Sequence, residues 1–282
     1  MAQRVKWHVA LATLLGGAVL ISCDAEGQKM QEIRFDLGKN IVDTARASGV
    51  PRFRTSNVNG SIDYSVNQIS AELSARFARP GYEISAAPIF SFRLSADHRN
   101  GVSDIVEATT LQIDTFKSHD TAQAFVEQLL GQFAKGKWKR YITDSCPAVT
   151  GRSSWLNAGG GLNIEGVVCA DPAYKLTRDD WLIVMRNGQR YRWIGDGVIS
   201  ELSVNFGDNP ATGVMYQMFL GFELEDVQKK RNAQADADHI KEGEAKGWNT
   251  AAKAVAGKKE TDAMNKLLEA NAIKRGDQVV PR

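Results

Sequence analysis

The first residues to test for chemistry are two serines beside glycines in the stretch TGRSSWLNAGGG, positions 150–161. A serine hydrolase of the G-x-S-x-G type needs a strand that leads into the nucleophile and a histidine placed as its base. Ser153 and Ser154 do not match that pattern. After the N-terminal segment the histidines are His98, His119 and His239, and nothing in their spacing selects one as a base. The sequence therefore predicts no catalytic triad.

Carboxylates gather at two places, Asp179-Asp180 and the group Glu223, Glu225 and Asp226. Glycoside hydrolysis needs two carboxyl groups that face each other across a cleft. Adjacent residues on one strand point to opposite sides, so neither group satisfies that requirement by itself. We interpret Asp179 and Asp180 as the end of a loop.

Phosphate, metal and cofactor motifs are also missing from the sequence. The triple glycine at 159–161 lacks the lysine and hydroxyl of a P-loop, and no G-x-G-x-x-G occurs. No H-E-x-x-H motif and no loop dense in Asp and Asn suggests a metal site. We therefore expect no catalytic residue, no metal and no cofactor, and we expect that the protein is not an enzyme.

Arginine and aromatic residues alternate near position 190, and these residue types are enriched at binding hot spots. A hairpin is predicted over 179–197, because Asn187-Gly188 suits a type I′ turn between two strand-like runs. Alternation alone could instead bury the aromatic residues and leave the arginines in solvent. The candidate partner-binding residues are Arg186, Arg190, Tyr191, Arg192 and Trp193.

Three cysteines occur, at positions 23, 146 and 169. With Cys23 assigned to the N-terminal segment described next, Cys146 and Cys169 form an even pair in an oxidising compartment, so we predict a disulfide. Such a bond would stabilise a glycine-rich loop by roughly 3 kcal/mol. The alternative is a metal site or a reactive thiol, although no histidine lies near either cysteine in the sequence.

The N-terminus has the layout of a secretory signal. Arg4 and Lys6 precede an apolar run from Trp7 to Ile21, and no acidic residue interrupts it. The run is shorter than the roughly 20 residues that a membrane-spanning helix needs. A segment that is cut away is therefore favoured over a permanent helix.

The end of this run, Leu20-Ile21-Ser22-Cys23, resembles the lipobox of bacterial lipoproteins. The resemblance covers about the first 24 residues. It implies that the sulfur of Cys23 is acylated, that cleavage occurs just before it, and that the mature protein is held in a lipid bilayer. Two or three acyl chains on one residue give stable anchoring, whereas one chain binds reversibly. Asp24 resembles the retention signal of enteric lipoproteins, which favours the inner over the outer membrane, on the periplasmic side.

Removal of the signal takes away Arg4 and Lys6 and leaves 33 basic and 33 acidic residues. A neutral mature chain suggests neither nucleic acid nor anionic lipid as a partner. About 260 residues remain, enough for one large domain or two small ones.

Apolar spacing predicts the elements. A helical face is predicted over 62–77, strands over 88–97 and 102–116 around a turn at 98–101, and a helix over about 120–136 with Asp120 as its N-cap. Further strands are predicted over 198–206 and 212–224. Residues 225–275 have helix-forming composition with little to bury, apart from an apolar stripe at Met264, Leu267, Leu268 and Ile273.

These elements predict an α+β fold: an antiparallel sheet, in one or two lobes, with packed helices. The expected organisation is a signal peptide (1–22), a tether (23–31), a globular region (32–224) with a sub-boundary near 140, and a charged helical tail (225–282).

The sequence favours a non-catalytic protein-binding module anchored to the membrane. In kind it resembles immunity lipoproteins, which neutralise a periplasmic toxin such as a phospholipase, so a protein partner is expected. Two alternatives stay open. One is an envelope hydrolase, and the other is a structural subunit of an envelope or secretion complex, which the charged tail would suit.

Overall fold

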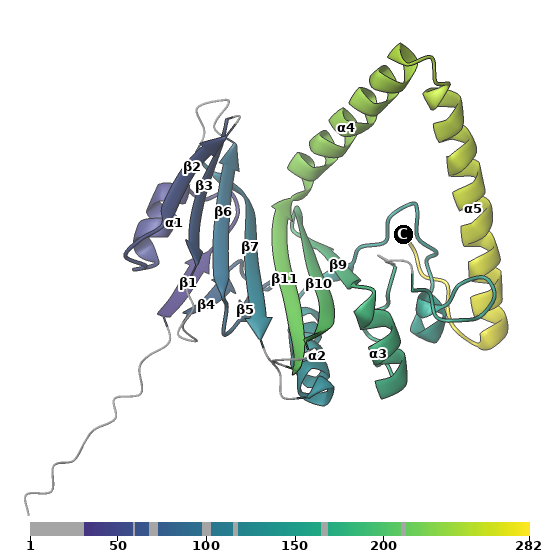
Figure 1. Ribbon diagram of the computed structural model, residues 1–282, viewed down its shortest axis with the longest axis horizontal. Helices are drawn as coiled ribbons and strands as arrows, with labels where there is room; N and C mark the ends of the chain where they lie inside the picture. The colour runs from purple at the N-terminus through teal and green to yellow at the C-terminus, as the bar shows by residue number, and fades with distance from the viewer. Residues whose placement is uncertain are drawn as a thin grey trace, which may run out of the picture.

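The computed structural model describes residues 31–58, 60–67, 73–97, 103–114, 118–164, 169–209 and 213–282. Cys23, the signal segment, the predicted turn at 98–101 and His98 lie outside these residues, as does all of the tether except Gln31. The fold is α+β, as the sequence predicts (Figure 1).

Within the described residues, eight strands form one antiparallel sheet in the order β2-β3-β6-β7-β11-β10-β9-β8. These are β2 (Arg54–Val58), β3 (Ser61–Asn67), β6 (Ser91–Asp97), β7 (Ile105–Asp114), β8 (Lys139–Arg140), β9 (Gln189–Gly195), β10 (Val198–Asn209) and β11 (Gly213–Leu224). The pairing of β7 with β11 makes the sheet continuous across residue 140, where the sequence suggested a sub-boundary.

A smaller sheet has the order β1-β4-β5, with β1 (Gln31–Phe35) parallel to β4 (Leu73–Phe77) and β5 (Ile84–Ala86) antiparallel to it. The helices are α1 (Ile41–Ala47), α2 (His119–Lys135), α3 (Arg178–Arg186), α4 (Glu225–Ala245) and α5 (Thr250–Arg275), with a 3₁₀ turn η1 (Gly151–Trp155).

Aromatic side chains join the two sheets and α2 into one core. Phe77 of the small sheet stacks on Phe222 of β11 at 4.5 Å between ring centroids. Phe133 of α2 stacks on Trp193 of β9 at 3.7 Å, and Trp138 contacts both Phe77 and Phe133. Stacked and tilted aromatic pairs contribute beyond their buried area. One face of the large sheet is therefore packed, and the other faces solvent.

The helix predicted over 62–77 is wrong, because the structure has strands β3 and β4 there. Ile62 and Val66 are four residues apart, and so are Leu73 and Phe77. A spacing of four places two side chains on one side of a strand as well as of a helix. The step of three that favoured a helix passed through Ile69, which lies outside the described residues.

The hairpin predicted around Asn187-Gly188 is also wrong, since residues 178–186 form α3. Thr177 caps this helix by accepting from the amide of Asp180 at 3.2 Å, so Asp179 and Asp180 lie in its first turn and do not end a loop. The observed hairpin joins β9 to β10 through Asp196-Gly197, whose φ angles are 49° and 71°. Both positive angles are those that a type I′ turn requires.

The helix predicted over 120–136 is confirmed as α2, with a correction to its cap. Ser118 is the N-cap, and its hydroxyl accepts from the amide of Thr121 at 3.2 Å. Asp120 lies in the first turn and pairs with Arg178 at 2.9 Å. The strands predicted near 88–97, 102–116, 198–206 and 212–224 are confirmed as β6, β7, β10 and β11.

The tail forms the two helices α4 and α5, which leave the sheet and return as an open frame (Figure 1). Residues 229–239 and 251–260 are all exposed. A helix that is polar on every side depends on i,i+4 pairs, and α4 has Lys229–Glu225 and Lys230–Asp226. The predicted stripe on α5 is not buried: Met264, Leu267 and Ile273 are exposed, and Asn265 and Ala272 face inward instead.

We predict that Phe133→Ala lowers the free energy of unfolding by about 3–5 kcal/mol, because it removes a ring stacked between α2 and β9. Urea unfolding measures this change. Val58→Ala is the control, since Val58 is 59% exposed on the edge strand β2, and we expect a change within about 0.5 kcal/mol. Equal losses for the two variants would contradict the described core.

Candidate functional site

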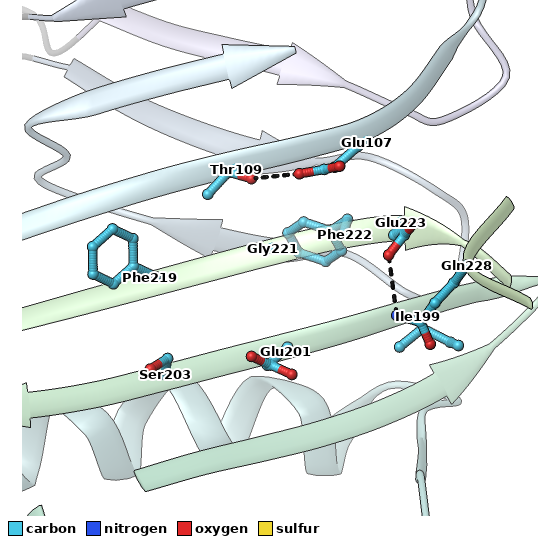
Figure 2. Close-up of a pocket in the computed structure, with 10 residues that line it drawn as sticks. All are labelled: Glu107, Thr109, Ile199, Glu201, Ser203, Phe219, Gly221, Phe222, Glu223 and Gln228. Atoms are coloured by element: carbon cyan, nitrogen blue, oxygen red, sulfur yellow. Dashed lines mark hydrogen bonds between the residues drawn. The ribbon is translucent and has the colours of Figure 1, made fainter. Parts of the chain in front are cut away.

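The solvent-facing side of the large sheet carries a groove of about 230 Å³ near the start of α4. Figure 2 shows its side chains rising from three neighbouring strands, β7, β11 and β10, with Gln228 reaching in from α4. The lining residues are Glu107, Thr109, Ile199, Glu201, Ser203, Phe219, Gly221, Phe222, Glu223 and Gln228. Three of them are glutamates, and none is basic or a histidine.

Strand alternation and register put these side chains together. Tyr216, Met218, Leu220 and Phe222 of β11 are buried, so the odd-numbered residues of this strand face the groove. Glu223 lies directly opposite Glu107, and Gly221 lies between Thr109 and Glu201. Glu107 and Glu223 are 116 residues apart in the sequence, and only the strand pairing brings them to one face.

Gly221 opens the middle of the groove. A Cβ atom at this position would have no neighbour nearer than 4.0 Å, so the space above the backbone is empty rather than crowded. Phe219, which is 38% exposed, forms an apolar wall at the next groove-facing position of β11. A bound group can therefore contact both backbone and an aromatic face here.

Glu107 and Glu223 form a like-charged pair on adjacent strands, an arrangement that is unfavourable without compensation. Arg231 of α4 contacts both carboxylates, Glu107 at 3.4 Å and Glu223 more closely. Gln228 donates to Glu223 at 3.0 Å, and Arg93 pairs with Glu107 at 3.1 Å. The start of α4 is thus fixed to the sheet by the charges of the groove.

Glu201 has its own arginine partners on β9. Arg192 lies 3.2 Å and Arg190 3.7 Å from its carboxylate oxygens. Arg192 also donates to Gln228 at 3.1 Å and lies over the ring of Tyr141 at 4.9 Å from the centroid. The arginines therefore form a rim outside the groove, while the interior carries the carboxylates.

Burial raises the pKa of Glu223 above its ordinary value, and the negative charge of Glu107 acts in the same direction. Hydrogen bonds from Gln228 and Arg231, together with the charge of Arg231, act in the opposite direction. The groove therefore offers three carboxyl groups, one of which has a raised proton affinity. It also offers one aromatic wall and two hydroxyls. These groups can hydrogen-bond a polar ligand or a cationic side chain.

Sequence reasoning missed Glu107 and Glu201, which belong to no local motif. It did single out Glu223, but only beside Glu225 and Asp226, and the structure separates these. Glu223 ends β11, whereas Glu225 and Asp226 lie in the first turn of α4. The sequence signal that could have placed Glu223 in the groove is the alternation of β11, which puts Glu223 on the side of the strand opposite Phe222.

The predicted contact surface is wrong for Tyr191 and Trp193, which are only 2% and 3% exposed. Alternation along β9 turns both rings into the core and leaves Arg190 and Arg192 on the groove side. Arg186 ends α3, and its guanidinium lies 5.6 Å from the ring centroid of Phe206. The three arginines thus form no single patch, although Arg190 and Arg192 contribute to the rim of the groove.

His119 lies away from the groove. Its Nδ1 is 2.7 Å from the hydroxyl of Tyr216, which also accepts from the indole of Trp181 at 3.0 Å. His239 is exposed on α4. Neither His119 nor His239 is among the residues that line the groove.

Cys146 and Cys169 lie at disulfide distance, with their Cα atoms 5.4 Å apart, as the sequence predicts. Among the residues that the structure describes, no three Cys, His, Asp or Glu side chains are placed to hold a metal ion. No helix in the described ranges is long and apolar enough to span a membrane.

No protein-family model matches the chain, and neither a curated protein nor a solved structure does.

We predict that Arg231→Gln raises the pKa of Glu223 further, because the substitution removes a positive charge and a hydrogen bond. NMR titration of the side-chain carboxyl carbons measures this shift. Arg54→Gln, on the exposed edge strand β2, is the matched control and should leave the Glu223 titration unchanged. An unchanged Glu223 titration in Arg231→Gln would contradict the described contacts.

The raised pKa of Glu223 also determines how the stability of the fold changes with pH. Between the ordinary and the raised pKa, the folded chain binds more protons at Glu223 than the unfolded chain, so stability falls as pH rises through this window. We predict that Glu223→Gln removes this part of the pH dependence, as urea unfolding at pH values from about 4 to 7 would show. If the stability of Glu223→Gln changed with pH in parallel with that of the wild type, this prediction would be contradicted.

Proposed function

We propose that this protein is a non-catalytic binding module, held at a membrane through acylated Cys23, that binds a protein partner over the groove of the large sheet. The lipobox resemblance of residues 20–23 supports the anchor. The groove supports the binding role, because the packed elements leave this side of the sheet open to solvent.

The observation that carries the binding role is the arrangement of charge around Gly221. Glu201, Glu223 and Glu107 line the interior, whereas Arg190, Arg93 and Arg231 stand at the rim. A partner that inserts a lysine or arginine over Gly221, with acidic residues around it, would match this pattern. Such complementarity contributes mainly to specificity and association rate.

In its narrower form, the proposal is an immunity lipoprotein that neutralises a toxin in the periplasm, such as a phospholipase. A membrane anchor would keep such an inhibitor where the toxin acts. This form is supported by a general likeness to immunity lipoproteins: a lipobox, an α+β body of this size and a surface suited to binding a protein.

One observation favours a hydrolase as the second candidate. Glu223 has a raised pKa and lies opposite Glu107 on the neighbouring strand, and glycan hydrolysis uses one carboxyl group as acid and a second as base or nucleophile. Each carboxylate, however, is bound by arginine from its own chain, which favours a role in recognition.

The anchor is tested by metabolic labelling with an alkyne-bearing palmitate analogue in a bacterial host. We predict that the wild-type chain incorporates the label and fractionates with membranes, whereas Cys23→Ser incorporates none. Cys146→Ser is the control and should be labelled as the wild type is. Equal labelling of Cys23→Ser would overturn the assignment of the acylated residue.

The binding surface is tested by pull-down from the native host, with residues 23–282 carrying Cys23→Ser as bait. We predict that Gly221→Val, which fills the groove, and Glu201→Lys, which reverses its charge, each reduce capture of the partner by about tenfold or more. Gln217→Ala, on the same side of β11 but outside the groove, should retain it.

Equal capture by all variants would place the interface elsewhere. A single partner whose toxicity the wild type suppresses would support the immunity form, and several envelope-complex proteins would favour a structural subunit. Release of soluble products from peptidoglycan by the purified wild type, but not by Glu223→Gln, would favour the hydrolase.

A further inference from the structure

The end of the chain is tied to the disulfide-closed loop. Residues 277–282, here called the strap, run beside residues 143–153, inside the frame formed by α4 and α5, where Figure 1 marks the C-terminus. The amide of Val280 donates to the carbonyl of Ala148 at 2.7 Å, and the amide of Thr150 donates to the carbonyl of Gln278 at 2.9 Å. Asp277 accepts from the amide of Ser153 at 2.9 Å.

Arg282 joins the strap to Cys146 itself. Its guanidinium donates to the carbonyl oxygens of Cys146 at 2.6 Å and Thr143 at 3.1 Å, and it pairs with Glu269 of α5 at 2.9 Å. The same Glu269 carboxylate accepts from the amide of Ala148 at 3.0 Å. Thr143 before Cys146 and Ala148 after it are thus linked, with Cys146 itself, to the end of the chain.

The strap and α5 together attach the far end of the helical frame to the loop. Among the described residues, 251–260 of α5 are all exposed, and burial on this helix is confined to its start and to the part that faces the loop. Asn265 reaches the loop too, by donating to the carbonyl of Asp144 at 2.9 Å. The position of α5 therefore depends on the shape of residues 143–153.

That shape depends in turn on the disulfide. Between β8 and α3, the described part of the chain has η1 as its regular element, so few backbone ladders hold it. Cys146 is buried, while Cys169 is half-buried and lines a groove between the loop and α5 with Pro147, Leu156 and Met264. Arg140 also links the two segments, by donating to the carbonyls of Val149 and Cys169.

We propose that the Cys146–Cys169 disulfide and the strap form a redox-sensitive latch: reduction of the disulfide loosens the strap and frees α5 from the body. This inference stands apart from the proposed function, because it uses neither the lipid anchor nor the groove on the sheet. Coupling between two sites is reciprocal, so the strap must also protect the disulfide.

The reductant is a dithiol. One of its thiolates attacks the sulfur of Cys169, the accessible partner, and the sulfur of Cys146 leaves as a thiolate. The second thiol of the reductant then attacks the mixed disulfide, which releases Cys169 and leaves the reductant as a cyclic disulfide. Two electrons and two protons pass from the reductant to the protein, and both cysteines end as thiols.

The test is hydrogen exchange, read by mass spectrometry on the 282-residue chain with Cys23→Ser in detergent, oxidised or reduced with dithiothreitol. We expect amides of 148–153 and 276–280 to exchange roughly tenfold faster after reduction, while those of β10 and β11 keep their rates. Unchanged exchange in the strap, or an equal increase throughout the sheet, would overturn the latch.

Reciprocity gives a second test, in which the strap is altered and the disulfide is observed. Arg282→Gln should shift the equilibrium between disulfide and dithiol toward the dithiol by roughly fivefold or more, as counted by thiol labelling in mixtures of reduced and oxidised dithiothreitol. Lys274→Gln is the matched control, since it removes an exposed positive charge from the last turn of α5. A disulfide–dithiol equilibrium in Arg282→Gln equal to that of the wild type would contradict the proposal even if the exchange result were positive.

Discussion

The pairing of β7 with β11 is the constraint on which the rest of the structure depends. It joins residues 107–114 to residues 216–223 and so connects strands from both halves of the chain into one sheet. The buried side of this pairing brings Phe222 onto Phe77, which attaches the small sheet. The exposed side brings Glu107 beside Glu223. One register thus produces both the core and the candidate site.

The charge on the exposed side then positions the next element. Two carboxylates opposite each other need a cation, and Arg231 supplies it from the second turn of α4. Gln228 adds a hydrogen bond from the first turn. A helix with almost no apolar surface to bury is therefore directed by polar contacts at its start. Its course away from the sheet follows from those contacts and not from packing.

The far end of the helical frame is held in a similar way. Arg282 and Glu269 connect α5 to the backbone around Cys146 through hydrogen bonds and one ion pair. The apolar residues of α5 take little part, since Met264, Leu267 and Ile273 remain exposed. Both ends of the frame are thus polar attachments, which are more easily altered by charge, competition or redox state than a hydrophobic core.

The sequence by itself determined the fold class, the strands with clear alternation, helix α2 and the cysteine pair, because each follows from local spacing or from residue count. It failed at 62–77, where a spacing of four fits two kinds of element, and at 178–186, where Thr177 starts a helix in a run that reads as a strand. The groove was decided by tertiary structure alone. Glu107, Glu201 and Glu223 share no local motif, and they meet because hydrogen-bonded register sets which distant residues lie opposite one another.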